Sequence, residues 1–247
     1  VEKLEKNERL SEKDGLDLYN LPLSVLGFYA NQRKEKRFQN KISFIRNYYM
    51  NFTNICCYAC KYCGFRRNKG DADAYTLSLE ELERRLRSAP EKVSEVWFSS
   101  GLNKSLPFSF YIELIQMVKK TLPSVQLKAF TAVEIDFFSK HFKLPVEEVL
   151  DELMSAGLDR IPGGGAEIFD DRVRKKIDIK TRPESYLEIH RLCHRKGMKT
   201  AITMLFGHVE ERSHRIRHML KLRDFQEDSG GVQAFIPLAY QDKNNPL

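Results

Sequence analysis

Three cysteines on one short segment carry the clearest chemical signal in this sequence. Cys56, Cys60 and Cys63 follow one another with the spacing C-x3-C-x2-C. Three thiolates so close together can hold three corners of a cubic [4Fe–4S] cluster. The fourth iron would then have no protein ligand nearby, and an open iron is a place where a small molecule binds. The spacing therefore predicts a cluster with one vacant coordination position.

Two other uses of these thiols stay open at this point. A structural zinc ion usually takes a fourth ligand from a second pair of residues, whereas Cys193 and His194 lie in a predicted helix without paired spacing. A thioredoxin-type redox pair needs only two cysteines at the start of a helix. Cys57 also forms a regular C-x2-C-x2-C with Cys60 and Cys63, and we interpret it as a spare, packed thiol. A disulfide framework is not indicated, because such frameworks spread their cysteines to close long loops.

The elements that must position these thiols alternate regularly along the chain. Strands are predicted over residues 42–50, 94–99, 125–131, 158–162, 198–206 and 232–238, and helices over residues 78–88, 107–121, 145–156, 181–196 and 213–228. Strands joined by helices of ten or more residues form parallel βαβ units. The predicted fold class is therefore α/β, a parallel TIM-type barrel with a partial (β/α)6 core. An open doubly wound sheet competes with it, and we favour the barrel because unusual polar and glycine-rich segments follow the strands, as in barrels with their active site at that end.

Composition sets the remaining limits. The chain has 247 residues with 41 Lys+Arg against 34 Asp+Glu, a net charge of +7, and 42% hydrophobic residues, which excludes a disordered tail or a fibrous protein. Basic residues interleave with acidic ones without an aromatic stripe, so no nucleic-acid partner is predicted, and short runs such as Arg174-Lys175-Lys176 are interpreted as solvated helix faces. No apolar stretch approaches the ~18 residues of a membrane span. The charged N-terminus lacks a signal region, and dense cysteines suit a reducing compartment, so we expect a cytoplasmic protein.

The domain organisation follows from the same reading. Residues 1–41 are predicted to form an N-terminal helical cap, and residues 42–247 the barrel core. Ser11 followed by Asp14 is typical of a helix start, and Pro22 is expected to open a second short helix.

The cysteine spacing after the first predicted strand, followed by the aromatic Phe65, resembles the radical S-adenosylmethionine (SAM) superfamily. From about residue 8 to the end, the chain is similar to the menaquinone-futalosine branch of that superfamily, and most similar to its aminodeoxyfutalosine synthase family. The similarity to this branch rests on residues 128–135, 161–169, 203–208 and 231–238.

The resemblance implies a [4Fe–4S] cluster on Cys56, Cys60 and Cys63, with SAM bound at the open iron and consumed as a substrate. The reduced cluster would cleave SAM to methionine and a 5′-deoxyadenosyl radical. That radical would add to the enol-ether double bond of 3-[(1-carboxyvinyl)oxy]benzoate, an anionic small molecule. Rearrangement and loss of bicarbonate would give 6-amino-6-deoxyfutalosine. An external one-electron reductant such as flavodoxin or ferredoxin is implied as a partner.

Five further residues are candidates for cofactor binding. The resemblance places Ser100 and Gly101 where related enzymes offer backbone to the methionine amino group. Gly163 and Gly164 let backbone approach a ligand closely, with a tight turn needed only for folding as the alternative. Glu167 is a candidate for the ribose hydroxyls, and its alternative role is to cap the next helix.

Two residues are candidates for substrate contact or proton transfer. Glu134 is expected at the end of the third strand, and His208 follows the fifth strand, although a lone histidine in a loop often only satisfies hydrogen bonds. The family usually has other residues at Tyr49, Ser100 and Asn103, and it continues beyond the sixth strand, which implies a further C-terminal part. A cyclase-like enzyme of the same branch and a catalytically degenerate cluster-binding paralogue are therefore kept as alternative functions.

Overall fold

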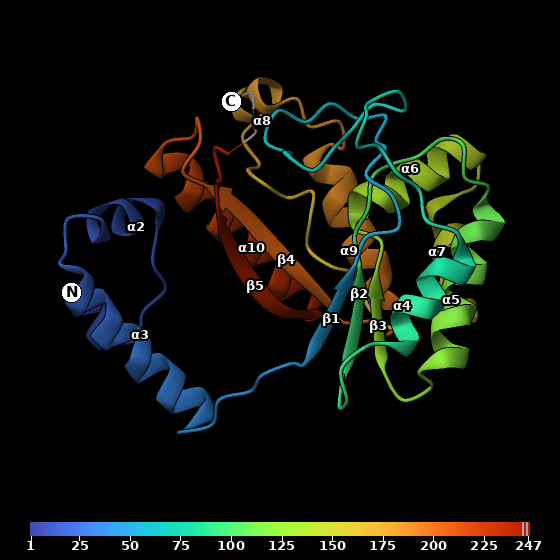
Figure 1. Ribbon diagram of the computed structural model, residues 1–247. Helices are drawn as coiled ribbons and strands as arrows, with labels where there is room; N and C mark the ends of the chain where they lie inside the picture. Colours follow the sequence, from blue (N-terminus) through green and yellow to red (C-terminus); the bar gives the residue numbers. More distant parts are fainter. Residues whose placement is uncertain (244, 246) are drawn as a thin grey trace.

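A curved parallel sheet forms the centre of the computed structural model, which describes residues 1–243, 245 and 247. β1 (Asn47–Met50), β2 (Glu95–Phe98) and β3 (Gln126–Ala129) pair in that order, and β4 (Thr200–Phe206) pairs with β5 (Val232–Ala239). Two isolated parallel bridges, Lys128 with Arg160 and Ile161 with Thr200, connect β3 to β4. The sheet therefore runs from β1 to β5 as part of a barrel (Figure 1), which confirms the predicted fold class.

The strand predicted over residues 158–162 is reduced to these two bridges. Pro162 follows at once and has no backbone N–H to extend the ladder. The first strand is also shorter than predicted, since only residues from Asn47 onward pair with β2, and Ile42 and Phe44 are exposed. The structure thus has five strands among the described residues, rather than six.

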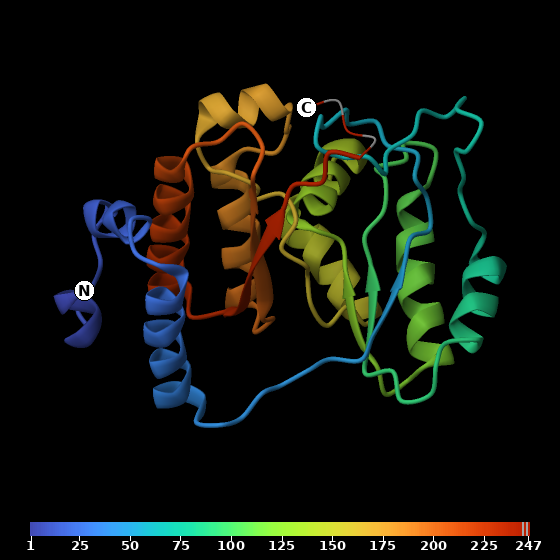
Figure 2. The same ribbon diagram turned by 60° about the vertical axis from the view of Figure 1, so that its left-hand side comes forward.

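Helices cover the outer side of this sheet (Figure 2). They are α4 (Leu79–Arg87), α5 (Phe108–Thr121), α6 (Ala132–Phe142), α7 (Val146–Ala156), α9 (Pro183–Arg195) and α10 (Arg212–Ser229), whereas α8 (Asp171–Ile177) lies beyond the carboxyl ends of the strands (Figure 1). Five of them match the predicted helices closely, and Ser78 caps α4 as expected by accepting a hydrogen bond from the Glu81 amide. Sequence reasoning missed α6 as a helix, because its first residues were assigned to the end of a strand.

Side chains alternate between the two faces of the sheet, as the two-residue period of a strand requires. Val96, Phe98, Leu127 and Ile202 point outward and belong to the buried core beneath the helices. Their neighbours in sequence, such as Trp97 and Lys128, therefore point to the inner face of the barrel.

Three N-terminal helices lie beside this core: α1 (Glu2–Glu5), α2 (Glu12–Leu18) and α3 (Leu23–Phe38). Ser11 and Asp14 form the expected capping box of α2. α2 packs against α10, where Gly15 lies against Ile216 and Arg217 pairs with Glu12 at 2.7 Å. The boundary at residue 41 stays a prediction. In the described part of the chain, no helix has the length and apolar character needed to cross a bilayer.

Candidate active site

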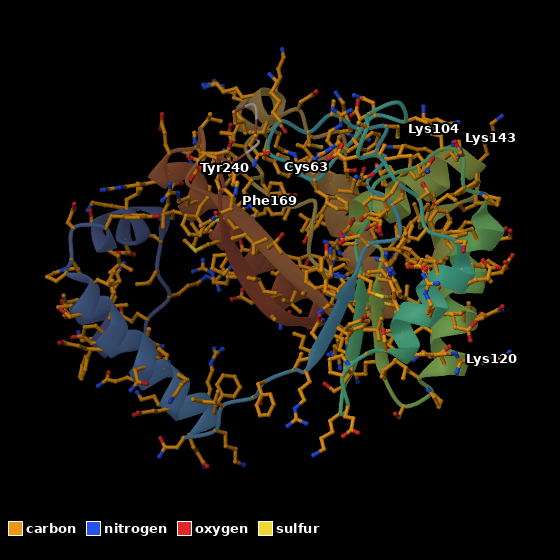
Figure 3. The ribbon with its side chains drawn as sticks, in the orientation of Figure 1. Cys63, Lys104, Lys120, Lys143, Phe169 and Tyr240 are labelled. Atoms are coloured by element: carbon orange, nitrogen blue, oxygen red, sulfur yellow. The ribbon has the colours of Figure 1, made fainter. Side chains whose placement is uncertain are left out.

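The cysteine segment leaves β1 and is anchored to three other parts of the fold. The backbone N–H of Cys56 donates to the Arg67 carbonyl (3.1 Å), that of Cys57 to the Leu102 carbonyl (3.0 Å), and that of Lys61 to the Ile177 carbonyl (3.0 Å). Figure 3 places Cys63 at the end of the barrel where Tyr240 follows β5. The segment therefore lies across the carboxyl ends of the strands, the end at which barrel enzymes build their sites.

The thiols themselves suit a metal cluster. All five cysteines are free, and Cys56, Cys60 and Cys63 are half-buried. Burial raises the pKa of the Cys60 thiol to about 12 and also raises that of Cys56. A cationic iron cluster would reverse this preference, because metal coordination deprotonates a thiol. Cys57 is exposed, so the prediction that it is a packed thiol was wrong.

No group of three or more His, Cys, Asp or Glu side chains in the described residues converges on the position of a single metal ion. A cubic cluster makes no such demand, since each of its cysteines binds a different iron. The donor set of three thiols from one loop fits a cluster of this kind.

The segment after β2 packs tightly against the cysteine loop. The Gly101 N–H donates to the Thr53 carbonyl at 2.9 Å, and a Cβ atom at Gly101 would lie 2.2 Å from the Ile55 carbonyl oxygen. Only glycine allows this approach. The Ser100 hydroxyl accepts a hydrogen bond from the Phe52 amide (2.9 Å). The Ser100 side chain is therefore held by the backbone of the loop that follows β1.

Glu134 lies in the first turn of α6, where the sequence predicted a strand end. Phe130 adopts a left-handed conformation after β3, and Thr131 then caps the helix. The Glu134 carboxylate accepts hydrogen bonds from the amide (2.7 Å) and hydroxyl (2.8 Å) of Thr131, and from the Ser100 amide (3.4 Å). Burial raises the pKa of Glu134 to about 7. This carboxyl group thus ties the ends of β2 and β3 together.

The three glycines after the 160–161 bridges form a compact turn. A Cβ atom at Gly163 would lie 2.8 Å from the backbone of Ile202, and one at Gly164 would lie 3.0 Å from Thr131. The Gly163 carbonyl accepts hydrogen bonds from the hydroxyls of Tyr186 (2.9 Å) and Thr203 (2.7 Å). These contacts give the turn a packing role, and a role in ligand binding stays a prediction.

Glu167 reaches the cysteine loop from the other side. Its carboxylate accepts hydrogen bonds from the Gly165 amide (2.9 Å) and from the hydroxyl of Tyr62 (3.1 Å), the residue before Cys63. Burial raises the pKa of Tyr62 well above its usual value, so the hydroxyl stays a donor. Asp170, and not Glu167, caps α8.

His208 lies apart from this group, and the hydrogen bonds of its side chain stay within its own turn. Its side chain is buried in the turn after β4, with Nε2 3.2 Å from the Leu205 carbonyl and Nδ1 3.4 Å from the Glu210 carboxylate. A catalytic role for His208 stays a prediction.

Two residues of the site escaped sequence reasoning. Tyr62 was passed over in favour of Phe65, although an aromatic residue between two predicted ligand cysteines was a visible signal. Arg174 was assigned to a solvated face, but it is buried and donates to the carbonyls of Gly165, Ala166, Ile168 and Thr181. It thereby holds the turn that carries Glu167, and its exposed neighbours Lys175 and Lys176 gave no hint of this.

Comparisons with known proteins agree with this geometry. The family model described as the radical SAM superfamily matches residues 50–222. Aminodeoxyfutalosine synthase of Streptomyces coelicolor is 42% identical over 97% of this chain and 63% of its own length. The enzyme of the same name from Thermus thermophilus is 41% identical, over 100% of this chain and 67% of its own. FO synthase of Mycobacterium leprae is 38% identical over 83% of this chain and 24% of its own.

The fold has known counterparts as well. A crystal structure of methylornithine synthase superposes with a TM-score of 0.79 at 15% identity, covering 100% of this chain and 69% of that one. The chain thus spans about two thirds of the length of its curated synthase relatives. With the cysteine loop at the carboxyl ends of a parallel partial barrel and a family match over most of the chain, this protein belongs to the radical SAM superfamily.

Proposed function

We propose that this protein is an aminodeoxyfutalosine synthase, which joins the 5′-deoxyadenosyl group of SAM to 3-[(1-carboxyvinyl)oxy]benzoate. The observation that carries the proposal is the similarity of 42% and 41% to two synthases of that name over 97% and 100% of the chain. FO synthase is less similar and aligns with less of the chain. Ser100, which departs from the family pattern, has its hydroxyl engaged by the Phe52 amide.

Members of the superfamily use a [4Fe–4S] cluster and SAM. The residues that would hold the cluster are Cys56, Cys60 and Cys63, whose thiols are free and share one loop. When bound and reduced, the cluster supplies the electron that splits SAM into methionine and the 5′-deoxyadenosyl radical. We propose an external one-electron carrier such as flavodoxin or ferredoxin as the source of that electron.

The chain's own residues would shape the site around this chemistry. The segment Ser100–Gly101 packs against the start of the cysteine loop. This segment and the turn Gly163–Gly164 are the proposed contacts for SAM, with Glu167 for its ribose. Because the Glu167 carboxylate already accepts from Tyr62 and Gly165, it is held in place before any ligand arrives. Fixed acceptors of this kind position a ligand without reorganising when it reacts.

Glu134 and His208 are the proposed residues for substrate contact or proton transfer. A carboxyl group with a pKa of about 7 can hold or release a proton near neutral pH, which suits this role for Glu134. Its engagement by Thr131 and Ser100 also gives it a positioning role.

The test is an anaerobic incubation of reconstituted protein with SAM, a chemical reductant and the enol-ether benzoate. We expect an adduct that contains adenine and the benzoate ring, together with methionine. If only 5′-deoxyadenosine forms, the protein cleaves SAM but is not the synthase. If the protein binds iron and sulfide and never cleaves SAM, it is a degenerate paralogue.

Two cysteine variants make a matched pair for this experiment. Cys60→Ala removes a proposed ligand, and we expect it to abolish both the brown absorbance and turnover. Cys57→Ala alters the exposed neighbouring thiol, and we expect wild-type iron content and activity. Equal loss in both variants would contradict the proposed ligand set.

A further inference from the structure

A row of four side chains crosses the inner face of the barrel one step below the carboxyl ends of the strands. The strand register pairs Tyr49 with Trp97, Trp97 with Lys128, and Lys128 with Arg160. Residues paired across parallel strands point to the same face, and the residues on either side of Trp97 and Lys128 belong to the outer core. The four side chains therefore line the barrel interior, beneath the cysteine loop.

The two cations of this row differ in how they are compensated. Lys128 Nζ lies 2.6 Å from the Glu95 carboxylate and 5.0 Å from the centre of the Trp97 ring. Arg160 donates to the side-chain carbonyl of Gln233, a neutral partner from β5. Among the described residues, no carboxylate lies within 4.0 Å of the Arg160 guanidinium. A guanidinium has five N–H donors in a planar fork, so Arg160 keeps donors for an anion.

The two aromatic members of the row, Tyr49 and Trp97, form a surface that suits a flat ligand. The rings of Tyr49 and Trp97 lie 4.8 Å apart, and the Trp97 indole N–H is buried without a hydrogen-bond partner. Buried donors of this kind are normally satisfied. A flat ligand that carries an acceptor would satisfy it.

We propose that this row binds the aromatic carboxylate of the substrate, with the ring against Tyr49 and Trp97 and the carboxylate on Arg160. The proposal rests on the proposed function, whose substrate has a benzoate ring and a second carboxylate. It assigns substrate specificity to residues outside the cysteine motif. Lys128, already paired with Glu95, orients the indole and adds positive potential next to the subsite.

The probe for the test is 3-(1-carboxyethoxy)benzoate, a saturated analogue of the substrate that keeps both carboxylates and lacks the reactive double bond. Its affinity is measured by isothermal titration calorimetry on the reconstituted protein with SAM present. The neutral diamide of the same compound is the matched ligand control. Arg160→Gln is the test variant. Lys120→Gln is the protein control, because Lys120 is exposed on α5 on the outer side of the barrel (Figure 3).

We expect the wild type and Lys120→Gln to bind the dicarboxylate and to reject the diamide. Arg160→Gln should bind the dicarboxylate about tenfold or more weakly, as expected for loss of a charged hydrogen bond. Arg160→Lys should recover part of that affinity, because it restores the charge without the fork. Thermal unfolding of each variant verifies that the fold is retained.

The outcomes separate this inference from the proposed function. If the wild type makes the adenine-bearing adduct and Arg160→Gln binds the probe as well as the wild type, the function stands and the inference is wrong. Equal affinity for the dicarboxylate and the diamide, or no binding of the probe to the wild type, also overturns it. If no adduct forms but the probe binds through Arg160, the function is wrong and the anionic aromatic subsite stands.

Discussion

Replacing Gly101 by alanine tests whether the loop after β2 supports the cysteine segment. In Gly101→Ala, the new Cβ would lie 2.2 Å from the carbonyl oxygen of Ile55, 2.7 Å from its carbonyl carbon and 3.0 Å from the carbonyl carbon of Asn54. Non-bonded carbon atoms normally stay about 3.5 Å from their neighbours. Since all three obstacles are backbone atoms, the loop itself must move by about 1 Å.

The loss in free energy of unfolding follows from the packing and the hydrogen bonds that this movement disturbs. Overpacking of this kind costs about 1–3 kcal/mol. The displacement also weakens the hydrogen bonds from Gly101 to Thr53 and from Cys57 to Leu102, each worth about 1 kcal/mol. We therefore expect Gly101→Ala to lower the free energy of unfolding by about 3–5 kcal/mol. Cys56 follows Ile55 directly, so the same shift should displace a proposed cluster ligand.

The assay combines urea unfolding of the apoprotein with iron and sulfide content after anaerobic reconstitution. Gly70→Ala is the control, because no atom lies within 4 Å of its added Cβ, and we expect its stability to change by no more than about 0.5 kcal/mol. A Gly101→Ala protein with wild-type stability and full iron content would refute the argument that this contact positions the loop.

Three further predictions concern the buried groups around the site. Below about pH 4.5 the carboxyl of Glu134 is protonated in both the folded and the unfolded chain. Between that pH and about 7 only the unfolded chain loses the proton, so the contribution of this group to the free energy of unfolding falls by about 3 kcal/mol as the pH rises. The free energy of unfolding of Glu134→Gln should therefore rise relative to that of the wild type from about pH 5 to about pH 8. Urea unfolding at both pH values measures this difference, and a difference that stays constant would contradict the raised pKa. Arg174→Leu removes four buried hydrogen bonds and should lower the free energy of unfolding, measured by thermal unfolding, by about 3 kcal/mol or more. For Lys175→Leu, at an exposed position, the change should stay within about 0.5 kcal/mol, and equal effects would mean that Arg174 does not stabilise the turn. A double-mutant cycle of Tyr62→Phe and Glu167→Ala, each of which removes one partner of the 3.1 Å hydrogen bond, should give a coupling energy of about 1 kcal/mol, and additivity would mean that this bond contributes nothing.

Local patterns were sufficient for much of the fold. The helices that begin at Ser78 and end before Gly157 and Gly230 could be predicted because caps and stops act within a few residues. The strand predicted over residues 158–162 is reduced to two bridges because Pro162 has no backbone N–H. The proline was visible in the sequence, but its effect depends on which strands lie beside it. α6 was missed because Thr131 and Glu134 are equally compatible with a strand end until Phe130 is seen to turn the chain.

What the sequence by itself determined is the chemistry that fits within one loop. Cys56, Cys60 and Cys63 are so close along the chain that their spacing alone predicts three ligands to one cluster, whatever surrounds them. Only the tertiary structure decided which distant residues meet them. Glu167 reaches Tyr62 across 105 positions, and Arg160 joins Trp97 on the inner face through the strand register. The first pair depends on how two distant loops pack, and the second on how strands align in space, since a shift of one residue in register would turn such side chains to the opposite face of the sheet.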